Sequence, residues 1–268
     1  MQQRELIRRA GDVLEKDPRV LAAWLAGSFG RGDADAFSDV DLLVVVSDDE
    51  RPGFLDEWES IVERIAPTVY RNALVHGAIG IYNAITEDWL RFDLTVVGPE
   101  HVRARPRSGL ELLFDRAQLH DGLPERGAPI PPNLDAVRRL TLEFLRVLGL
   151  LPVALGRGEL QLAVTGCGLL RTHLVSLFLE TACVEDRGGA LKLNPLLSAE
   201  QRALLEGLPP VAATRESVID ANRAMADAFL PCARALHEEL ALDWPEEFER
   251  ATLSHLENQV GLRLGEHA

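Results

Sequence analysis

The sequence has little of the chemistry that marks secreted, membrane or zinc-binding proteins. Its 268 residues include only three cysteines, an odd number without Cys-x-x-Cys spacing, which argues against a disulfide framework and a zinc site. No run of 18 apolar residues is present to span a membrane, and the first residues lack an apolar signal core. We therefore expect a cytoplasmic protein without a membrane segment, in which Cys167, Cys183 and Cys232 are buried free thiols.

Positive charge is also scarce. The chain has 28 Lys and Arg against 42 Asp and Glu, a formal net charge of −14, and its lysines are confined to Lys16 and Lys192. A surface that follows nucleic-acid phosphates needs basic patches, so no nucleic-acid partner is expected. The acidity suits a small cationic molecule instead.

Hydrophobic periodicity divides the chain into two parts. The first is predicted to contain helices at 2–16 and 53–65 and strands at 20–26, 39–46, 68–75, 78–85, 89–97 and 110–115. A passage rich in Pro and Gly follows. Beyond it the spacing predicts helices at 134–155, 160–183, 199–206, 214–242 and 245–264. The fold class is therefore α+β, with a mixed-sheet domain over residues 1–125 and a helical bundle over residues 126–268.

The most informative stretch places two carboxylates at the start of a buried strand. Asp39 and Asp41 stand two residues apart and lead into five aliphatic residues, 42–46. Side chains at i and i+2 of a strand share a face and lie roughly 6–7 Å apart, because the rise is about 3.3 Å per residue. Both carboxylates can then converge on the same cations.

The residues before this pair have the chemistry of an anion site. Gly27 follows a predicted strand and permits a close backbone approach that a side chain would block. Ser28 offers a hydroxyl and an amide N–H, and Arg31 offers a guanidinium fork suited to phosphate oxygens. An alternative interpretation treats residues 27–41 as a solvated hairpin loop, since Gly and Asp are ordinary turn residues.

A third carboxylate is expected on a neighbouring strand. Asp93 alternates with apolar residues in strand 89–97, so it lies on the polar face of that strand. It is therefore predicted to face Asp39 and Asp41, although an exposed pairing with Arg91 is the alternative. Glu87 and Asp88 are weaker candidates, because residues 85–88 have the pattern of a turn.

The segment Ala26-Gly27-Ser28, followed after ten residues by Asp39-Val40-Asp41, resembles the signature of the polymerase-β-like nucleotidyltransferase superfamily. A small domain of this kind followed by a helical domain resembles the antibiotic adenylyltransferases. Those bacterial resistance enzymes attach a nucleoside monophosphate to a hydroxyl of an aminoglycoside or a lincosamide. The resemblance is close at residues 26–46, looser at residues 92–94, and only general in the helical half.

The resemblance implies the roles of the site residues. Asp39, Asp41 and Asp93 would ligate two Mg²⁺ ions, with Asp93 completing a metal shell or acting as general base. The phosphates of ATP or another nucleoside triphosphate would be bound by the remaining candidates, which are Gly27, Ser28, Arg31 and Lys192. Attack of the acceptor hydroxyl on the α-phosphorus would release pyrophosphate.

Two further classes of function stay open at this point. One is an antitoxin-like nucleotidyltransferase that modifies a protein or RNA partner, although such proteins usually lack so large a helical domain. The other is a non-catalytic nucleotide-binding module, which three intact aspartates argue against. Either a monomer or a homodimer is compatible with the sequence.

Overall fold

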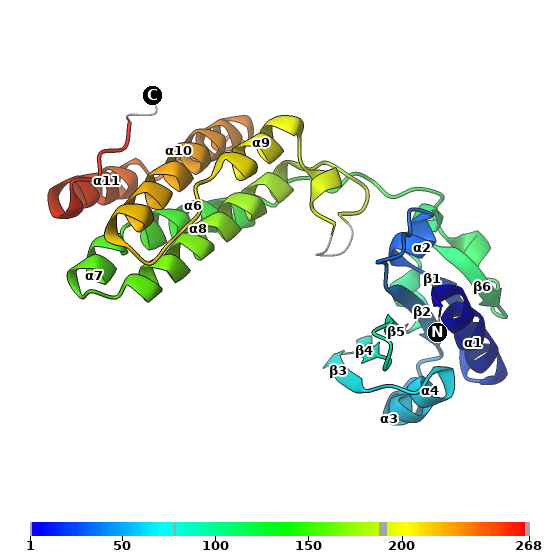
Figure 1. Ribbon diagram of the computed structural model, residues 1–268. Coiled ribbons are helices and arrows are strands. Elements are labelled where there is room, and N and C mark those ends of the chain that lie inside the picture. The colour runs from blue at the N-terminus through cyan, green and yellow to red at the C-terminus, as the bar shows by residue number, and fades with distance from the viewer. Residues whose placement is uncertain (1, 78, 188–191, 266–268) are drawn as a thin grey trace. The chain divides into compact units, whose positions relative to one another are not determined.

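The computed structural model describes residues 2–77, 79–187 and 192–265 (Figure 1). The chain forms two compact units, Met1–Ala128 and Pro129–Ala268. The first combines a sheet with helices and the second is helical. The α+β class predicted from the sequence is confirmed.

The first unit follows the predicted order of helices and strands closely. Its elements are α1 (Gln3–Lys16), β1 (Val20–Leu25), α2 (Gly27–Arg31), β2 (Val40–Val46), α3 (Arg51–Asp56), α4 (Trp58–Ile65), β3 (Tyr70–His76), β4 (Ile79–Ile85), β5 (Arg91–Val97), α5 (Pro99–Val102), η1 (Arg107–Gly109), β6 (Glu111–Asp115) and η2 (His120–Gly122). The fifth strand begins at Arg91 rather than Trp89, because Trp89 has a φ of 61° and belongs to the preceding turn.

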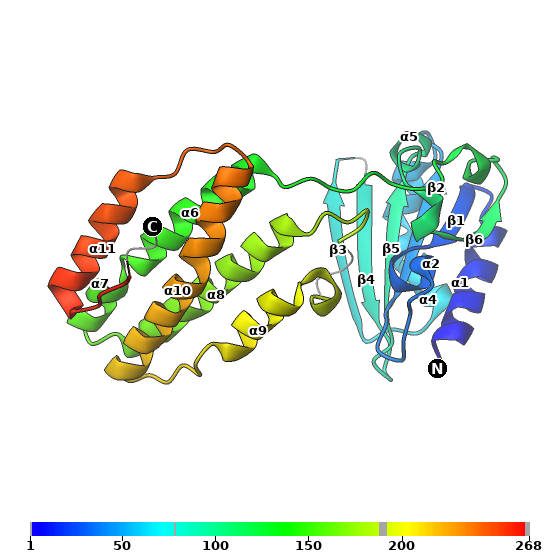
Figure 2. The same ribbon diagram turned by 90° about the horizontal axis from the view of Figure 1, so that it is seen from above.

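The six strands form one mixed sheet in the order β3-β4-β5-β2-β1-β6 (Figure 2). Strands β2 and β5 run parallel, and the other neighbouring pairs are antiparallel. The strand that carries Asp41 therefore lies in the middle of the sheet, directly beside the strand that carries Asp93. This arrangement gives both carboxylates a rigid base.

The two faces of the sheet are covered differently. Apolar residues of α1, α3 and α4 pack on one face, where Leu14, Phe54 and Ile65 join the aliphatic side chains of β2 and β5 in a continuous core. The opposite face has a smaller core around Trp24 and Val45. Alternation along β2 and β5 places Asp41 and Asp93 on this second face, where both are only half-buried.

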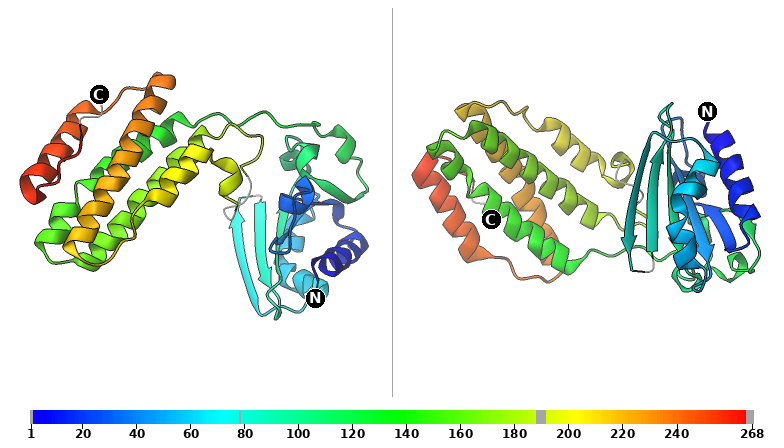
Figure 3. Two further views of the ribbon diagram at one scale, coloured as in Figure 1. Left: turned by 45° about the horizontal axis from the view of Figure 1, so that its top comes forward. Right: turned by 90° about the horizontal axis from the view of Figure 1, so that it is seen from below.

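The second unit is a bundle of helices (Figure 3). Its elements are α6 (Leu134–Leu148), α7 (Leu151–Gly156), α8 (Leu160–Thr181), η3 (Asn194–Leu196), α9 (Ala199–Gly207), α10 (Arg215–Glu239) and α11 (Glu246–Val260). Buried side chains of α6, α8 and α10 form one core. At its centre the rings of Phe144 and Phe229 stack with centroids 3.8 Å apart and an interplanar angle of 2°.

Two helices predicted as continuous are divided. The helix predicted over residues 53–65 is α3 and α4, which meet at Glu57 with φ −96° and ψ 6°. The helix predicted over residues 134–155 is α6 and α7. Gly149 ends α6, and Pro152 lies in the first turn of α7, where its missing N–H costs no hydrogen bond. Apolar periodicity continues across both breaks and therefore hides them.

Helix α8 is long and largely apolar, although Arg171, His173 and Glu180 interrupt it. By length and composition it is the one helix in the described part of the chain that meets the requirement for crossing a membrane, which the sequence analysis did not anticipate. Its side chains Cys167, Leu170 and Leu174 are buried in the bundle core. Core helices of globular proteins pass the same test, so this feature is weak evidence for a membrane segment.

The three cysteines are free, but they differ in burial. Cys167 is buried, as predicted, and lies 3.2 Å from the Nδ2 of Asn222. Cys232 is partly buried. Cys183 is exposed, so the prediction that it is buried in a helix is wrong: α8 ends at Thr181, and Cys183 lies in the segment that follows.

The stacked phenylalanines generate a prediction about the bundle. Phe144→Ala removes a fully buried ring and should lower the free energy of unfolding of the helical unit by about 3–5 kcal/mol. Leu142→Ala, on the same helix but with Leu142 45% exposed, should lower it by less than about 1 kcal/mol. Urea denaturation followed by circular dichroism measures both. Equal losses would show that the stacked pair does not centre the core.

Candidate active site

The Gly-Ser segment forms a short helix beside the carboxylates. The backbone N–H of Ala26 donates to the carbonyl of Asp41 at 2.8 Å, which ties the end of β1 to the start of β2. Helix α2 begins at the next residue, Gly27. This short helix, which the sequence analysis does not predict, therefore starts directly against the strand that carries Asp41.

Gly27 is required by this close approach. Its φ is +56°, and a Cβ built on it would lie 1.8 Å from Oδ2 of Asp41. Neither the conformation nor the space admits another residue without displacement of the carboxylate. The glycine therefore determines where the Asp41 carboxylate lies, in addition to permitting the turn.

The strand register brings Asp93 next to Asp41. In the parallel pair of β2 and β5, Asp41 is the register partner of Asp93, so the predicted placement on a neighbouring strand and a common face is confirmed. Asp39 immediately precedes β2, and its Oδ2 lies 3.7 Å from Nη1 of Arg91. The alternative pairing of Arg91 with Asp93 is thus replaced by a contact with Asp39. Arg91 also donates to the carbonyl of Phe37 at 3.0 Å.

Crowding of the carboxylates changes their protonation. Burial, together with the charges of Asp39 and Asp93, raises the pKa of Asp41 to about 6, although the charges of Arg31 and Arg91 oppose the change. Two like charges close together in a partly desolvated site resist simultaneous ionisation.

The pKa of Asp93 is raised as well. Burial is the main cause, and the charge of Asp39 adds to it, whereas the side-chain amide of Asn83 and the charge of Arg91 lower it. A carboxylate with a raised pKa is a better proton acceptor near neutral pH than an ordinary one.

The three carboxylates offer the type of ligand that a hard divalent cation binds. Asp39, Asp41 and Asp93 supply carboxylate oxygens, the ligands that Mg²⁺ prefers, and a cation would relieve their mutual repulsion. Within the described residues, no three His, Cys, Asp or Glu side chains are close enough together to form a ready metal cluster. Their assignment as metal ligands therefore stays a prediction.

Ser28 carries a buried polar atom that needs a partner. Its side chain is 6% exposed, and its Oγ has no hydrogen-bond partner among the described residues. A buried hydroxyl without a partner costs about 1–3 kcal/mol. A phosphate oxygen at this position would satisfy it, in agreement with the nucleotide-binding role predicted for Ser28.

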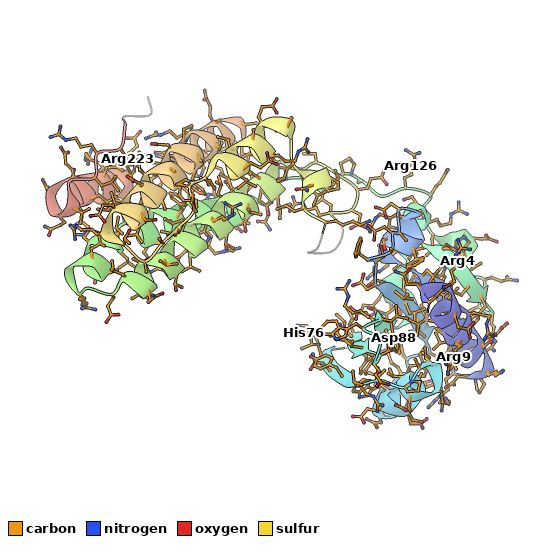
Figure 4. The ribbon with its side chains drawn as sticks, viewed as in Figure 1. Arg4, Arg9, His76, Asp88, Arg126 and Arg223 are labelled. Atoms are coloured by element: carbon orange, nitrogen blue, oxygen red, sulfur yellow. The ribbon has the colours of Figure 1, made fainter. Side chains whose placement is uncertain are left out.

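The remaining predicted residues lie in different places. Arg31 ends α2, and its Nε lies 3.5 Å from Oδ1 of Asp33. Lys192 belongs to the helical unit, where it precedes η3 and is half-buried, so its contact with a triphosphate stays a prediction. Asp88, labelled in Figure 4, accepts a hydrogen bond from Oγ1 of Thr86 at 2.5 Å in the turn between β4 and β5.

Two residues near the carboxylates are not among the site residues predicted from the sequence. Arg91 contacts Asp39, and Asn83 is the register partner of Asp93 across β4 and β5. The alternation of polar and apolar residues in the sequence shows which positions of β4 and β5 are polar. It does not show the register that pairs Asn83 with Asp93. No signal in the sequence marks Asn83.

The contact between Gly27 and Asp41 predicts a specific loss of stability. Gly27→Ala adds both a left-handed alanine and a clash, whereas Gly32→Ala adds only the first, since Gly32 has φ +76° and no atom within 4 Å of its Cβ position. Gly32→Ala should cost about 1–2 kcal/mol and Gly27→Ala clearly more. Urea unfolding of the full chain compares them. Equal costs would contradict the close contact.

The raised pKa of Asp41 predicts a pH dependence in metal-free buffer. The folded chain holds this proton up to about pH 6, whereas the unfolded chain releases it near 3.8. The stability that Asp41 contributes is therefore fully present below about pH 4 and lost as the pH rises through 6. Asp41→Asn removes this dependence and should be about 1–2 kcal/mol more stable than wild type at pH 7.5, after allowance for solvent screening.

Thermal and urea unfolding from pH 4 to pH 8, with EDTA present, test this expectation. Asp49→Asn, in the exposed turn after β2, is the matched control and should follow the wild-type curve. Parallel curves for wild type and Asp41→Asn would contradict the raised pKa.

Comparison with known proteins agrees with this geometry. Residues 7–72 match the family model of the nucleotidyltransferase domain, a stretch from α1 to the start of β3 that includes Gly27, Ser28, Asp39 and Asp41. Asp93 lies outside the match. No curated protein matches the chain.

Solved structures show distant similarity over most of the chain. An aminoglycoside 6-adenyltransferase from Bacillus subtilis is 17% identical, with 94% of this chain and 95% of that chain covered and a TM-score of 0.45. A nucleotidyltransferase-like protein from Exiguobacterium sibiricum 255-15 is 14% identical, with 97% and 88% covered and a TM-score of 0.32. A CCA-adding enzyme is 13% identical, with 95% and 72% covered and a TM-score of 0.32.

The family match rests on the residues that build the site, since it includes the Gly-Ser pair and two of the three carboxylates. The N-terminal unit therefore carries a nucleotidyltransferase domain match over residues 7–72.

Proposed function

We propose that this enzyme transfers a nucleoside monophosphate, AMP from ATP, to a hydroxyl of a small cationic acceptor such as an aminoglycoside or lincosamide antibiotic. The observation that carries the proposal is the pairing of Asp41 with Asp93 on adjacent parallel strands, beside Asp39 and the Gly27-Ser28 turn. An oxygen-rich, negatively charged site of this kind is suited to Mg²⁺-dependent transfer between phosphate and hydroxyl groups.

Each residue then has a defined task. Asp39, Asp41 and Asp93 would hold Mg²⁺, which when bound neutralises the triphosphate charge and lowers the pKa of the acceptor hydroxyl. The buried hydroxyl of Ser28 would donate to a phosphate oxygen, and Arg31 would add a positive charge beside it. These groups position the nucleotide for attack and stabilise the charge that develops.

The reaction is balanced by one proton transfer. The acceptor oxygen forms a bond to the α-phosphorus while the bond from that phosphorus to the bridging oxygen of the β-phosphate breaks, and pyrophosphate leaves. Asp93 would accept the hydroxyl proton, a task that its raised pKa favours near neutral pH.

The charge of the chain supports a cationic acceptor. A net charge of −14 attracts amino-substituted molecules over a Debye length of about 8 Å at physiological ionic strength. Modification of an antibiotic in the cytoplasm, where nucleoside triphosphates are available, would give resistance. Either a monomer or a homodimer is compatible with this function.

Incubation with each nucleoside triphosphate, Mg²⁺ and a panel of aminoglycosides and lincosamides tests the proposal. Mass spectrometry should detect one acceptor that gains a nucleoside monophosphate, together with release of pyrophosphate. Labelling of a protein or RNA in place of every small molecule would overturn the acceptor class and favour the antitoxin-like alternative.

The same assay tests the carboxylates. Asp93→Asn keeps the shape of the side chain but removes its charge and its ability to accept the proton, and should lower the transfer rate by about a hundredfold or more. The Asp49→Asn control should stay near the wild-type rate. Near wild-type transfer by Asp93→Asn would contradict the role of this residue.

A further inference from the structure

A row of four polar side chains crosses the face of the sheet that carries the smaller core. Asp41 pairs with Asp93 across β2 and β5, Asp93 pairs with Asn83 across β5 and β4, and Asn83 pairs with Asn72 across β4 and β3. All four are half-buried. The row therefore extends from the carboxylates at the centre of the sheet to its edge, and Asn83 is its first uncharged member.

Asn83 is the neutral side chain that acts on Asp93. Asn83 is the cross-strand register partner of Asp93 on the same face of the sheet, at a separation where opposed side chains interact. Burial and the charge of Asp39 raise the pKa of Asp93, and in line with this placement the amide of Asn83 lowers it. An amide that donates to one edge of a carboxylate fixes the plane of that carboxylate. The opposite edge of Asp93 is then left for a cation or for the acceptor hydroxyl.

The backbone under Asn83 is rigid. Its neighbours in β4, Tyr82 and Ala84, point to the opposite face, where each is 1% exposed. Tyr82 also stacks on Trp58 of α4 with centroids 4.6 Å apart. Strand β4 is paired with β3 and β5, and its Tyr82 packs on α4. The backbone position of Asn83 relative to Asp93 is therefore fixed.

We propose that Asn83 is a positioning residue for Asp93, which holds the carboxylate in the orientation that metal binding and proton transfer require. This inference rests on the proposed function. It goes beyond the family signature, because that signature fixes the aspartates but not the residue on the next strand. Asn83 does not touch the reacting atoms; it acts through Asp93.

A purely structural role for Asn83 makes a different prediction. The side chain lies on the half-open face, so its loss should change stability little, in contrast to loss of a core residue. Asn72 offers a matched control: the same amide-to-methyl change, in the same row, one strand further from Asp93.

The experiment compares Asn83→Ala with Asn72→Ala by two readouts in the full chain. The first is the rise in melting temperature with increasing Mg²⁺, measured without nucleotide. The apparent dissociation constant for Mg²⁺ should rise about tenfold in Asn83→Ala, as expected for loss of a group that orients a metal ligand, and should be unchanged in Asn72→Ala.

The second readout is steady-state kinetics at saturating Mg²⁺. In Asn83→Ala, kcat should fall about tenfold while KM for the nucleotide stays near the wild-type value, because the amide that orients the reacting carboxylate is lost. Should Asn83→Ala not fold, Asn83→Ser replaces it, since its shorter side chain keeps β4 polar but does not reach Asp93. The same losses are expected.

The outcomes separate this inference from the proposed function. Unchanged Mg²⁺ binding and kcat in Asn83→Ala, or equal losses in Asn72→Ala, would overturn the positioning role. Absence of transfer by the wild type with every acceptor would overturn the proposed function alone, since the comparison of Mg²⁺ binding would still decide the role of Asn83.

Discussion

Repulsion among Asp39, Asp41 and Asp93 is the constraint on which the N-terminal unit depends. Burial raises the pKa of Asp41 and of Asp93, and the charge of Asp39 raises both further; these carboxylates would separate if the backbone were free to yield. They stay together because β2 and β5 are central strands with a continuous apolar core beneath them. The free energy for the crowded site comes from burial on the opposite face of the same sheet.

Positive charge near the site moderates this repulsion without removing it. Arg91 reaches Asp39, and Arg31 at the end of α2 lowers the pKa of Asp41. Both are arginines, which remain charged at any physiological pH. These arginines offset part of the negative charge of the three carboxylates.

Helix α2 connects the residues predicted to bind phosphate with the carboxylates. The backbone hydrogen bond from Ala26 to Asp41 joins the two strands at this point, and Gly27 has no side chain to keep them apart. Together they place the buried hydroxyl of Ser28 beside β2. Two segments of the predicted site, separated by ten residues in the sequence, thus meet at a single junction between strand and helix. A change at Gly27 alters both.

The sequence alone determined the fold class, most strand and helix positions, and the residue types of the site, because periodicity and the Gly-Ser and Asp-x-Asp spacing are local properties of the chain. It could not determine where α6 gives way to α7, since apolar periodicity continues across that break, nor that Cys183 is exposed. Only the tertiary structure decided that Arg91 contacts Asp39 and that Asn83 lies beside Asp93. Those contacts depend on strand order and register, which are set by how the whole sheet packs on its helices and not by any short stretch of residues.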